Sequence, residues 1–448
     1  MHDFGAEDDA FAAAVFAFAH RRAAADAAPG GLRLGRPRTP AELDAAAGPS
    51  VTAGGLGAAE VLRRFTEVLE PACLSVDHPG YLAFVPAAPT EVAIFGDLVT
   101  SACSIYAGSW LEGAGAVWAE NQALRWLADL AGLPAGAGGC FVAGATNGNL
   151  SALVVARHAA TRRLAAGGGE RPARWVVVAG EFAHSSVDTA AAVMDAELVR
   201  VPGERLTGAA LAPVLAELGP RVAAVVATAG TTNLGRVDDL RSVTAAGRAA
   251  GVWCHVDGAY GAAALAAPSA RHRFAGIEAA DSLVVDPHKW LFAPFDSCAL
   301  LYAEPAHARS ALAQHASYLD ILTESGDWNP SDYAVHLSRR ARGLPFWFSL
   351  AAHGADAYAA AVEANLAVAA AAADLVRAAP HLELVAEPEL SIVAFRRLGW
   401  GEPELKAWSL AALDAGIGFV VPSKHAGEPI LRLCVVNPRT TVDHVAAL

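Results

Sequence analysis

The chain has 448 residues, of which 54% are hydrophobic and 18% are charged. This length allows either two domains or one large domain with a smaller lobe. The formal net charge of −13 gives no electrostatic reason to bind nucleic acid or an anionic membrane, so a small molecule is the expected partner.

No stretch of the sequence is expected to combine the length and the apolar purity of a membrane span. The alanine-rich run from Ala359 to Ala373 is interrupted by Glu363 and Asn365. The N-terminus is acidic where a signal peptide carries positive charge. Six scattered cysteines without metal-ligand spacing indicate a reducing compartment, so we expect a cytoplasmic protein with no metal site.

Residues 10–28 are mostly alanine, with Phe11, Val15, Phe16 and Phe18 among them. This pattern predicts a helix with an apolar face. Proline-rich and glycine-rich segments follow it as linkers. Such an arm is too short to form its own core, so we expect it to pack against another part of the assembly.

The segment that begins at His78 is rich in aromatic residues and proline. It is too irregular for a helix and too rich in proline for a central strand. Phe84, Val85 and Pro86 make it apolar, and it carries no Arg, Lys, Asn or Gln that could hold a side-chain carboxylate. An ordinary packed surface loop is the alternative interpretation.

Residues 112–131 have apolar side chains at helical spacing, and Gly132 and Pro134 end this predicted helix. A glycine-rich segment then leads into a second helical run. Small residues before a helix let backbone N–H groups approach a phosphate, whose charge the helix dipole favours. Ala145 and Thr146 are therefore the candidate phosphate-binding residues.

Apolar runs at 175–179 and 222–228 alternate with helical runs such as 211–218. This alternation continues to Tyr302 and predicts an α/β fold with a mainly parallel sheet covered by helices on both faces. In such sheets, ligands bind at the C-terminal ends of the strands. The candidate residues at these ends are Ala145, His184, Thr231, Asp257 and Lys289.

A carboxylate ends the apolar run 252–257, and small residues follow it. An aspartate at the tip of a strand can sit beneath a pyridine nitrogen and keep it protonated, so that the ring accepts electrons. We therefore assign Asp257 this role. Ala259 would leave room for the flat ring.

Lys289 follows the apolar run 282–285, which predicts a buried strand. Burial disfavours the ammonium form of a lysine and leaves a neutral amine that condenses with an aldehyde. The aldehyde this site suggests is pyridoxal phosphate. The alternative is a lysine that merely extends from a strand end to solvent.

The pattern changes after Glu304. The segment 325–333 is polar and rich in turn residues, and a long alanine-rich helix and several strand-like runs follow it. We predict an N-terminal helical arm over residues 1–75, a large cofactor-binding domain over 76–345, and a small α+β domain over 346–448.

The segments His255–Tyr260 and Asp286–Trp290 resemble the signature of the pyridoxal-phosphate group II decarboxylases, the family of aromatic L-amino-acid, tyrosine and glutamate decarboxylases. The likeness runs from about His78 to Thr441. It implies the pyridoxal-phosphate-dependent fold type I, like that of aspartate aminotransferase. It also implies a homodimer in which the N-terminal arm packs across the partner and the active site lies at the subunit interface.

The resemblance also implies roles for individual residues. His184 would stack on the cofactor ring and contact the substrate carboxylate, and Thr231 and His288 would lie near the cofactor. Tyr333 would donate a proton to the carbanionic carbon after carbon dioxide leaves. The sequence departs from the commoner family form by having Thr-Asn-Gly at 146–148, where Ser-Glu-Ala often stands.

The matching family loop lines the substrate pocket, so the resemblance places Phe84, Val85 and Pro86 in its wall. Tyr106 and Trp110 would join this wall, from the same subunit or from its partner. Arg432 could hold a substrate carboxylate, but a decarboxylase must leave that group weakly solvated, so we expect only a structural role for it.

The expected function is decarboxylation of an L-amino acid, aromatic or otherwise apolar, to an amine and carbon dioxide. Within the same fold the alternatives are oxidative deamination to an aldehyde, transamination, and decarboxylation of an unusual biosynthetic amino acid. A non-catalytic binding protein that retained the fold is the alternative of a different class.

Overall fold

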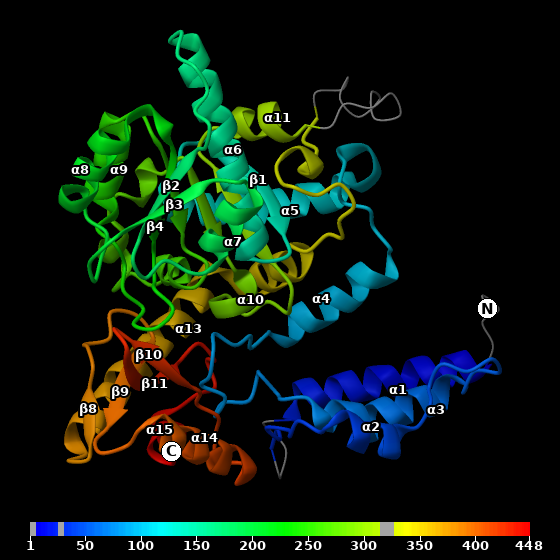
Figure 1. Cartoon of the computed structure of the whole chain (residues 1–448). Helices are drawn as coiled ribbons and strands as arrows, with labels where there is room; N and C mark the ends of the chain where they lie inside the picture. The colour runs from blue at the N-terminus through cyan, green and yellow to red at the C-terminus, as the bar shows by residue number, and fades with distance from the viewer. Residues whose placement is uncertain (1–5, 26–30, 314–326) are drawn as a thin grey trace.

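The computed structural model describes residues 6–25, 31–313 and 327–448. A large domain with a seven-stranded sheet is joined to a small domain with a four-stranded sheet, and the N-terminal helices extend away from both as an arm (Figure 1). The arm helices are α1 (Ala6–Ala23), α2 (Pro40–Ala47) and α3 (Ala58–Arg64).

The large sheet has the strand order β1-β7-β6-β5-β4-β2-β3. Its strands are β1 (Gly138–Val142), β2 (Val176–Gly180), β3 (Glu197–Val201), β4 (Val222–Thr228), β5 (Trp253–Asp257), β6 (Ser282–Val285) and β7 (Cys298–Tyr302). Strands β3, β2, β4, β5 and β6 run parallel, whereas β7 is antiparallel to both of its neighbours. The predicted α/β fold with a mainly parallel sheet is confirmed.

Helices cover both faces of this sheet and bury its apolar strands in two core layers. The helices of the large domain are α4 (Glu91–Ala102), α5 (Trp110–Leu130), α6 (Ala145–Ala166), α7 (Ser186–Val193), α8 (Gly208–Leu218), α9 (Leu240–Ala249), α10 (Pro287–Trp290) and α11 (Pro305–Leu312). One layer contains side chains of α6, α7 and α11, and the other those of α5, α8 and α9.

Side-chain caps explain where several of these helices begin. Thr90, Ser109, Thr207 and Asp239 each accept a hydrogen bond from a backbone N–H in the first turn of α4, α5, α8 and α9. Helix α6 differs, because its N-cap residue is Gly144, which has no side-chain oxygen. Its first N–H groups therefore remain available to a ligand.

The small domain contains an antiparallel sheet of order β10-β11-β9-β8. Its strands are β8 (Leu382–Leu384), β9 (Ile392–Arg397), β10 (Pro422–His425) and β11 (Glu428–Cys434), and its helices are α14 (Glu402–Asp414) and α15 (Val442–Ala446). Helix α13 (Leu344–Ala378) packs against this sheet and against α4 and α5 of the large domain.

Residues 80–84 pack with the small domain, although the predicted boundary at residue 76 assigns them to the large one. The Leu82 N–H donates to the Phe419 carbonyl at 2.9 Å, and the Cys434 N–H donates to the Leu82 carbonyl at 3.0 Å. Leu82 is fully buried in the apolar core of the small domain. This segment is therefore fixed to the small domain.

Helix α13 is long and apolar enough to cross a membrane by length and composition alone, with a mean hydropathy of 1.5. The expectation that no stretch combines the length and the apolar purity of a membrane span is wrong by this measure, because the apolar helix begins well before Ala359, at Leu344. The helix is interrupted at Gly354, which has φ 78°. Its buried side chains, among them Phe346, Tyr358 and Val362, pack in the core of the large domain.

Candidate active site

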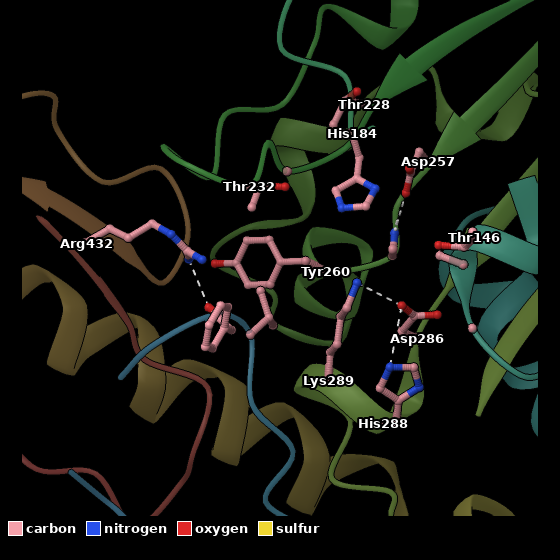
Figure 2. Close-up of a pocket in the computed structure, with 16 residues that line it drawn as sticks. Thr146, His184, Thr228, Thr232, Asp257, Tyr260, Asp286, His288, Lys289 and Arg432 are labelled. Atoms are coloured by element: carbon pink, nitrogen blue, oxygen red, sulfur yellow. Dashed lines mark hydrogen bonds and ion pairs between the residues drawn. The ribbon is translucent and has the colours of Figure 1, made fainter. Parts of the chain in front are cut away.

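A pocket of about 370 Å³ lies at the C-terminal ends of the central strands of the large sheet (Figure 2). It brings together nine of the residues predicted from the sequence. They are Phe84, Val85, Ala145, Thr146, His184, Asp257, Ala259, His288 and Lys289.

Lys289 lies in the single turn of α10, directly after β6. Its Nζ atom lies 2.8 Å from Oδ2 of Asp286, a carboxylate that is only 2% exposed. Burial by itself lowers the pKa of Lys289, but the charge and hydrogen bond of Asp286, together with the charge of Asp257, outweigh this and raise it. The predicted neutral amine is therefore wrong for the cofactor-free protein, in which Lys289 is an ion-paired ammonium.

Asp257 ends β5 and presents its carboxylate to the pocket. Its Oδ1 accepts a hydrogen bond from the Ala259 N–H at 3.1 Å, and its Oδ2 accepts one from the Asn149 side chain at 2.9 Å. Only 6% of the residue is exposed. The carboxylate is thus fixed by two donors on the protein side, and a ring in the pocket can meet its remaining lone pairs.

His184 follows β2 and points into the pocket from the side opposite Lys289 (Figure 2). Its Nδ1 accepts a hydrogen bond from the Ser186 N–H at 3.1 Å. A neutral ring with Nδ1 as acceptor carries its proton on Nε2. His184 can therefore cover one face of a flat ring and present an N–H donor to a substrate.

The pocket fits pyridoxal phosphate. Lys289 supplies an amine for the aldehyde, Asp257 a carboxylate for the ring nitrogen, and the N-terminus of α6 an anion site at Ala145 and Thr146. Within the described part of the chain, two buried atoms on the pocket residues, Thr228 Oγ1 and Asp286 Oδ1, have no hydrogen-bond partner. Unsatisfied buried polar atoms beside a cavity are typical of a site that a polar ligand completes.

Five predicted site residues do not line this pocket: Pro86, Tyr106, Trp110, Thr231 and Tyr333. Thr231 is buried, and its hydroxyl accepts a hydrogen bond from the Arg236 N–H at 3.1 Å, while the adjacent Thr232 faces the pocket. The Tyr106 hydroxyl donates to the Leu337 carbonyl at 3.1 Å. Of the predicted wall, one chain alone supplies Phe84 and Val85, and a contribution of Tyr106 and Trp110 from the partner subunit stays a prediction.

Tyr333, the predicted proton donor, also lies outside the pocket. It is 3% exposed, and its ring stacks on Trp328 with 4.3 Å between the ring centroids. Burial raises the pKa of Tyr333 to about 12. Within its own chain the aromatic ring is packed in the core layer beneath α6 and α11, so the role of proton donor stays a prediction.

Seven pocket residues were missed by the sequence analysis as site residues: Gly144, Thr228, Gly230, Thr232, Tyr260, Asp286 and Arg432. Asp286 could have been found, because it lies three residues before Lys289 and so on the same face of a helical turn. Tyr260 stacks on Trp290 with 5.3 Å between the centroids and shares a 2.6 Å hydrogen bond with Ser391.

Arg432 makes a structural contact, as expected, and it also lines the pocket. It comes from β11 of the small domain, lines the pocket, and donates a hydrogen bond to the Phe84 carbonyl at 2.9 Å (Figure 2). Phe84 has a positive φ of 54° and is 55% exposed. Arg432 therefore holds the apolar wall in place and adds a cation to the pocket.

The fold and the pocket together define a pyridoxal-phosphate enzyme of fold type I. Residues 43–398 match the model of the pyridoxal-dependent decarboxylase conserved domain, which is most of the chain. The chain therefore belongs to the pyridoxal-dependent decarboxylase family, and it is a pyridoxal-phosphate-dependent amino-acid decarboxylase.

Relatives of known activity agree with this assignment. The chain is 31% identical to an aromatic-L-amino-acid decarboxylase of Bacillus atrophaeus over 83% of this chain and 79% of the relative. It is also 31% identical to an L-2,4-diaminobutyrate decarboxylase of Rhizobium meliloti, over 87% and 80%. The crystal structure of Oryza sativa TDC with PLP and tryptamine matches with a TM-score of 0.90 and 25% identity, covering 100% of this chain and 97% of that one.

Proposed function

We propose that the protein decarboxylates an aromatic L-amino acid to the corresponding amine. The observation that carries this proposal is the side-chain wall of the pocket, in which Phe84 and Val85 are apolar and Arg432 is hydrogen-bonded to the backbone of Phe84. The pocket carboxylates, Asp257 and Asp286, already have partners on the cofactor side. A cationic side chain of a diamino acid would find no free carboxylate in this wall.

Different pocket residues have different roles in the proposed reaction. Pyridoxal phosphate supplies the electron sink that accepts the electrons of the broken carbon–carboxylate bond. Asp257 would hold the ring nitrogen of the cofactor, and His184 would cover the ring. Lys289 would bind the aldehyde, and Asp286, 2.8 Å from the Lys289 Nζ atom, can hold the proton of this amine. His184 and Lys289 are the two groups placed to carry a proton to the reacting carbon.

Mass spectrometry of the products tests the substrate proposal. The protein is incubated with pyridoxal phosphate and a mixture of the common L-amino acids, and we expect one amine at the mass of an aromatic substrate minus carbon dioxide. Phe84→Ala should raise KM for that substrate by about tenfold. This factor corresponds to a loss of roughly 1.4 kcal/mol of binding free energy from apolar contact with the Phe84 ring. Leu410→Ala, at a site 49% exposed on α14, is the matched control and should leave KM unchanged. An amine from a diamino acid alone would refute the proposal.

A second candidate reaction is decarboxylation coupled to oxidative deamination, which yields an aldehyde. The observation that favours it is the position of Tyr333 outside the pocket, since the resemblance assigns that tyrosine the protonation that ends in an amine. Release of ammonia and hydrogen peroxide in step with substrate loss would support this reaction. An amine formed in equal amount to the carbon dioxide would exclude it.

We also propose a homodimer with the active site at the subunit interface. Four large apolar side chains on α4 and α5 are about half exposed or more: Leu98, Val99, Leu111 and Trp118. Exposed apolar side chains and an arm that extends away from both domains are features that protein interfaces commonly bury. A solution mass of two chains is expected.

The variant Trp118→Asp should shift this mass to that of one chain, because it places a charge in the proposed interface. Val193→Asp is the matched control, since Val193 is 66% exposed on α7 and not on the helices α4 and α5 that carry the four side chains. A single-chain mass for the unmodified protein at full activity would refute the dimer.

A further inference from the structure

Three side chains of β5 lie on the same face of the sheet, because they alternate along the strand. They are Trp253, His255 and Asp257. Two neighbouring elements complete the row: Ser282 on β6 is the register partner of His255, and α6 places Asn149 between His255 and Asp257. Asn149, His255 and Ser282 are fully buried.

The row is a continuous chain of short hydrogen bonds. Trp253 Nε1 lies 2.8 Å from Ser282 Oγ, and Ser282 Oγ lies 2.8 Å from His255 Nδ1. His255 Nε2 lies 2.8 Å from Asn149 Oδ1, and Asn149 Nδ2 lies 2.9 Å from Asp257 Oδ2. These hydrogen bonds therefore join the indole of Trp253 to the carboxylate of Asp257, which faces the pocket.

The carboxylate at the end of the row fixes the direction of its bonds. An ionised carboxylate can only accept, so Asn149 donates its NH₂ group to Asp257 and turns Oδ1 toward His255, which donates from Nε2. A neutral His255 then accepts at Nδ1 from the Ser282 hydroxyl, which itself accepts from the Trp253 indole. Burial lowers the pKa of His255 to about 4, which agrees with a neutral ring.

The other contacts of Asn149 agree with this direction of the hydrogen bonds. Asn149 Nδ2 donates to Asp257 Oδ2 and also to Ser186 Oγ at 2.9 Å, so both of its amide protons are used. A flipped Asn149 amide would turn its oxygen toward the carboxylate and its NH₂ group toward the His255 N–H. Both contacts would then be repulsive, so the protonated Nε2 of His255 holds Asn149 as a donor to Asp257.

We propose that His255 is a positioning residue of the active site, which acts through Asn149 to hold the Asp257 carboxylate toward the ring nitrogen of the cofactor. The chain Trp253–Ser282–His255–Asn149 is the device that fixes its tautomer. This inference rests on the cofactor assignment and is independent of which amino acid is the substrate. Its tests therefore use no substrate.

Nitrogen NMR of the cofactor-free protein labelled at histidine tests the tautomer directly. We expect the His255 ring to show a protonated Nε2 and an unprotonated Nδ1 across neutral pH. Trp253→Phe removes the donor to Ser282 Oγ, which can then accept from a protonated Nδ1, so a second tautomer should become detectable. A proton on Nδ1, or a doubly protonated ring, in the unmodified protein would overturn the proposal.

Cofactor binding by two variants tests whether His255 acts through Asn149 on Asp257. His255→Gln keeps a donor near the position of Nε2 and should bind pyridoxal phosphate with a Kd within about twofold of the unmodified protein. His255→Leu removes the donor and should raise Kd by about tenfold and shift the absorption band of the bound cofactor, because the buried Asn149 Oδ1 then has no donor and Asn149 is no longer held against Asp257. His336→Gln, at a half-buried histidine outside the row, is the control and should change neither quantity.

Equal Kd values and equal spectra for His255→Leu and His255→Gln would overturn the proposal. A loss of binding in both variants would also overturn it, since a general packing defect would then explain the result. If His255→Leu does not fold, the comparison of His255→Gln with the unmodified protein and the NMR tautomer decide the matter. A failed substrate assay would leave all of these results unaffected.

Discussion

Asp286 controls how readily Lys289 gives up its proton, and Asp286→Asn removes this control while it keeps the shape of the side chain. The Asp286 carboxylate is 2% exposed and lies 2.8 Å from the lysine Nζ. Its charge raises the pKa of Lys289 against the opposing effect of burial. In the variant burial acts with less opposition, so the neutral amine should form at a lower pH.

The size of the effect follows from the geometry. Opposite unit charges 2.8 Å apart attract by about 6 kcal/mol at an effective dielectric constant of about 20. Desolvation of two buried charges offsets much of this attraction. If only a quarter remains, about 1.4 kcal/mol, the fraction of neutral amine at a given pH rises about tenfold in the variant.

Stopped-flow absorbance of cofactor-free protein mixed with pyridoxal phosphate measures this change, because only the neutral amine attacks the aldehyde. At neutral pH the variant should form the lysine-linked cofactor about tenfold faster, and the difference should disappear at alkaline pH, where both proteins carry a neutral amine. Asp129→Asn, which breaks an exposed ion pair of 2.7 Å with Arg125, is the matched control. The same pH dependence in all three proteins would refute the reasoning.

Three further predictions follow from the described geometry. Tyr333→Phe should keep turnover within about twofold with an amine as product, since the ring lies outside the pocket; an aldehyde product would restore its predicted role. Glu120→Ala should lower the free energy of unfolding in urea by about 3–5 kcal/mol, because it leaves the buried Arg339 guanidinium, now bonded at 2.8 Å, without its counter-charge; a loss under about 1 kcal/mol would contradict this. Burial raises the pKa of Asp238 from 3.8 to about 6, so the folded protein keeps a proton that the unfolded chain releases. Unfolding free energy should therefore fall by about 3 kcal/mol as pH rises from about 4 to about 6, and Asp238→Asn should abolish this slope.

The sequence was sufficient to predict the large sheet and the residues at its strand ends. Parallel strands are buried on both faces, so they appear as continuous apolar runs, and a polar residue that ends such a run stands out. Asp257 and Lys289 follow this rule, and both line the pocket. The sequence also shows that Trp253, His255 and Asp257 alternate along β5. Their connection to each other depends on Asn149 of α6, whose contact with His255 only the structure shows.

The residues that the sequence did not place correctly depend on turns and on remote segments. After β4 the turn contains Gly230 with φ 112°, and a Cβ there would lie 2.8 Å from Gly261. This conformation directs Thr232, and not Thr231, into the pocket. Arg432 reaches the pocket from a strand far along the chain, and no local pattern of residues indicates such a contact.

The pocket is built from two separately supported parts. Asp257, Lys289 and the N-terminus of α6 belong to the large domain, whereas Phe84 belongs to a segment that is hydrogen-bonded to the small domain and held by Arg432. Mutations in the small domain can therefore change which side chain is accepted and leave the cofactor contacts intact. Divergence of substrate preference within one conserved chemistry, as between decarboxylases of aromatic amino acids and of diaminobutyrate, is the evolutionary outcome that this construction favours.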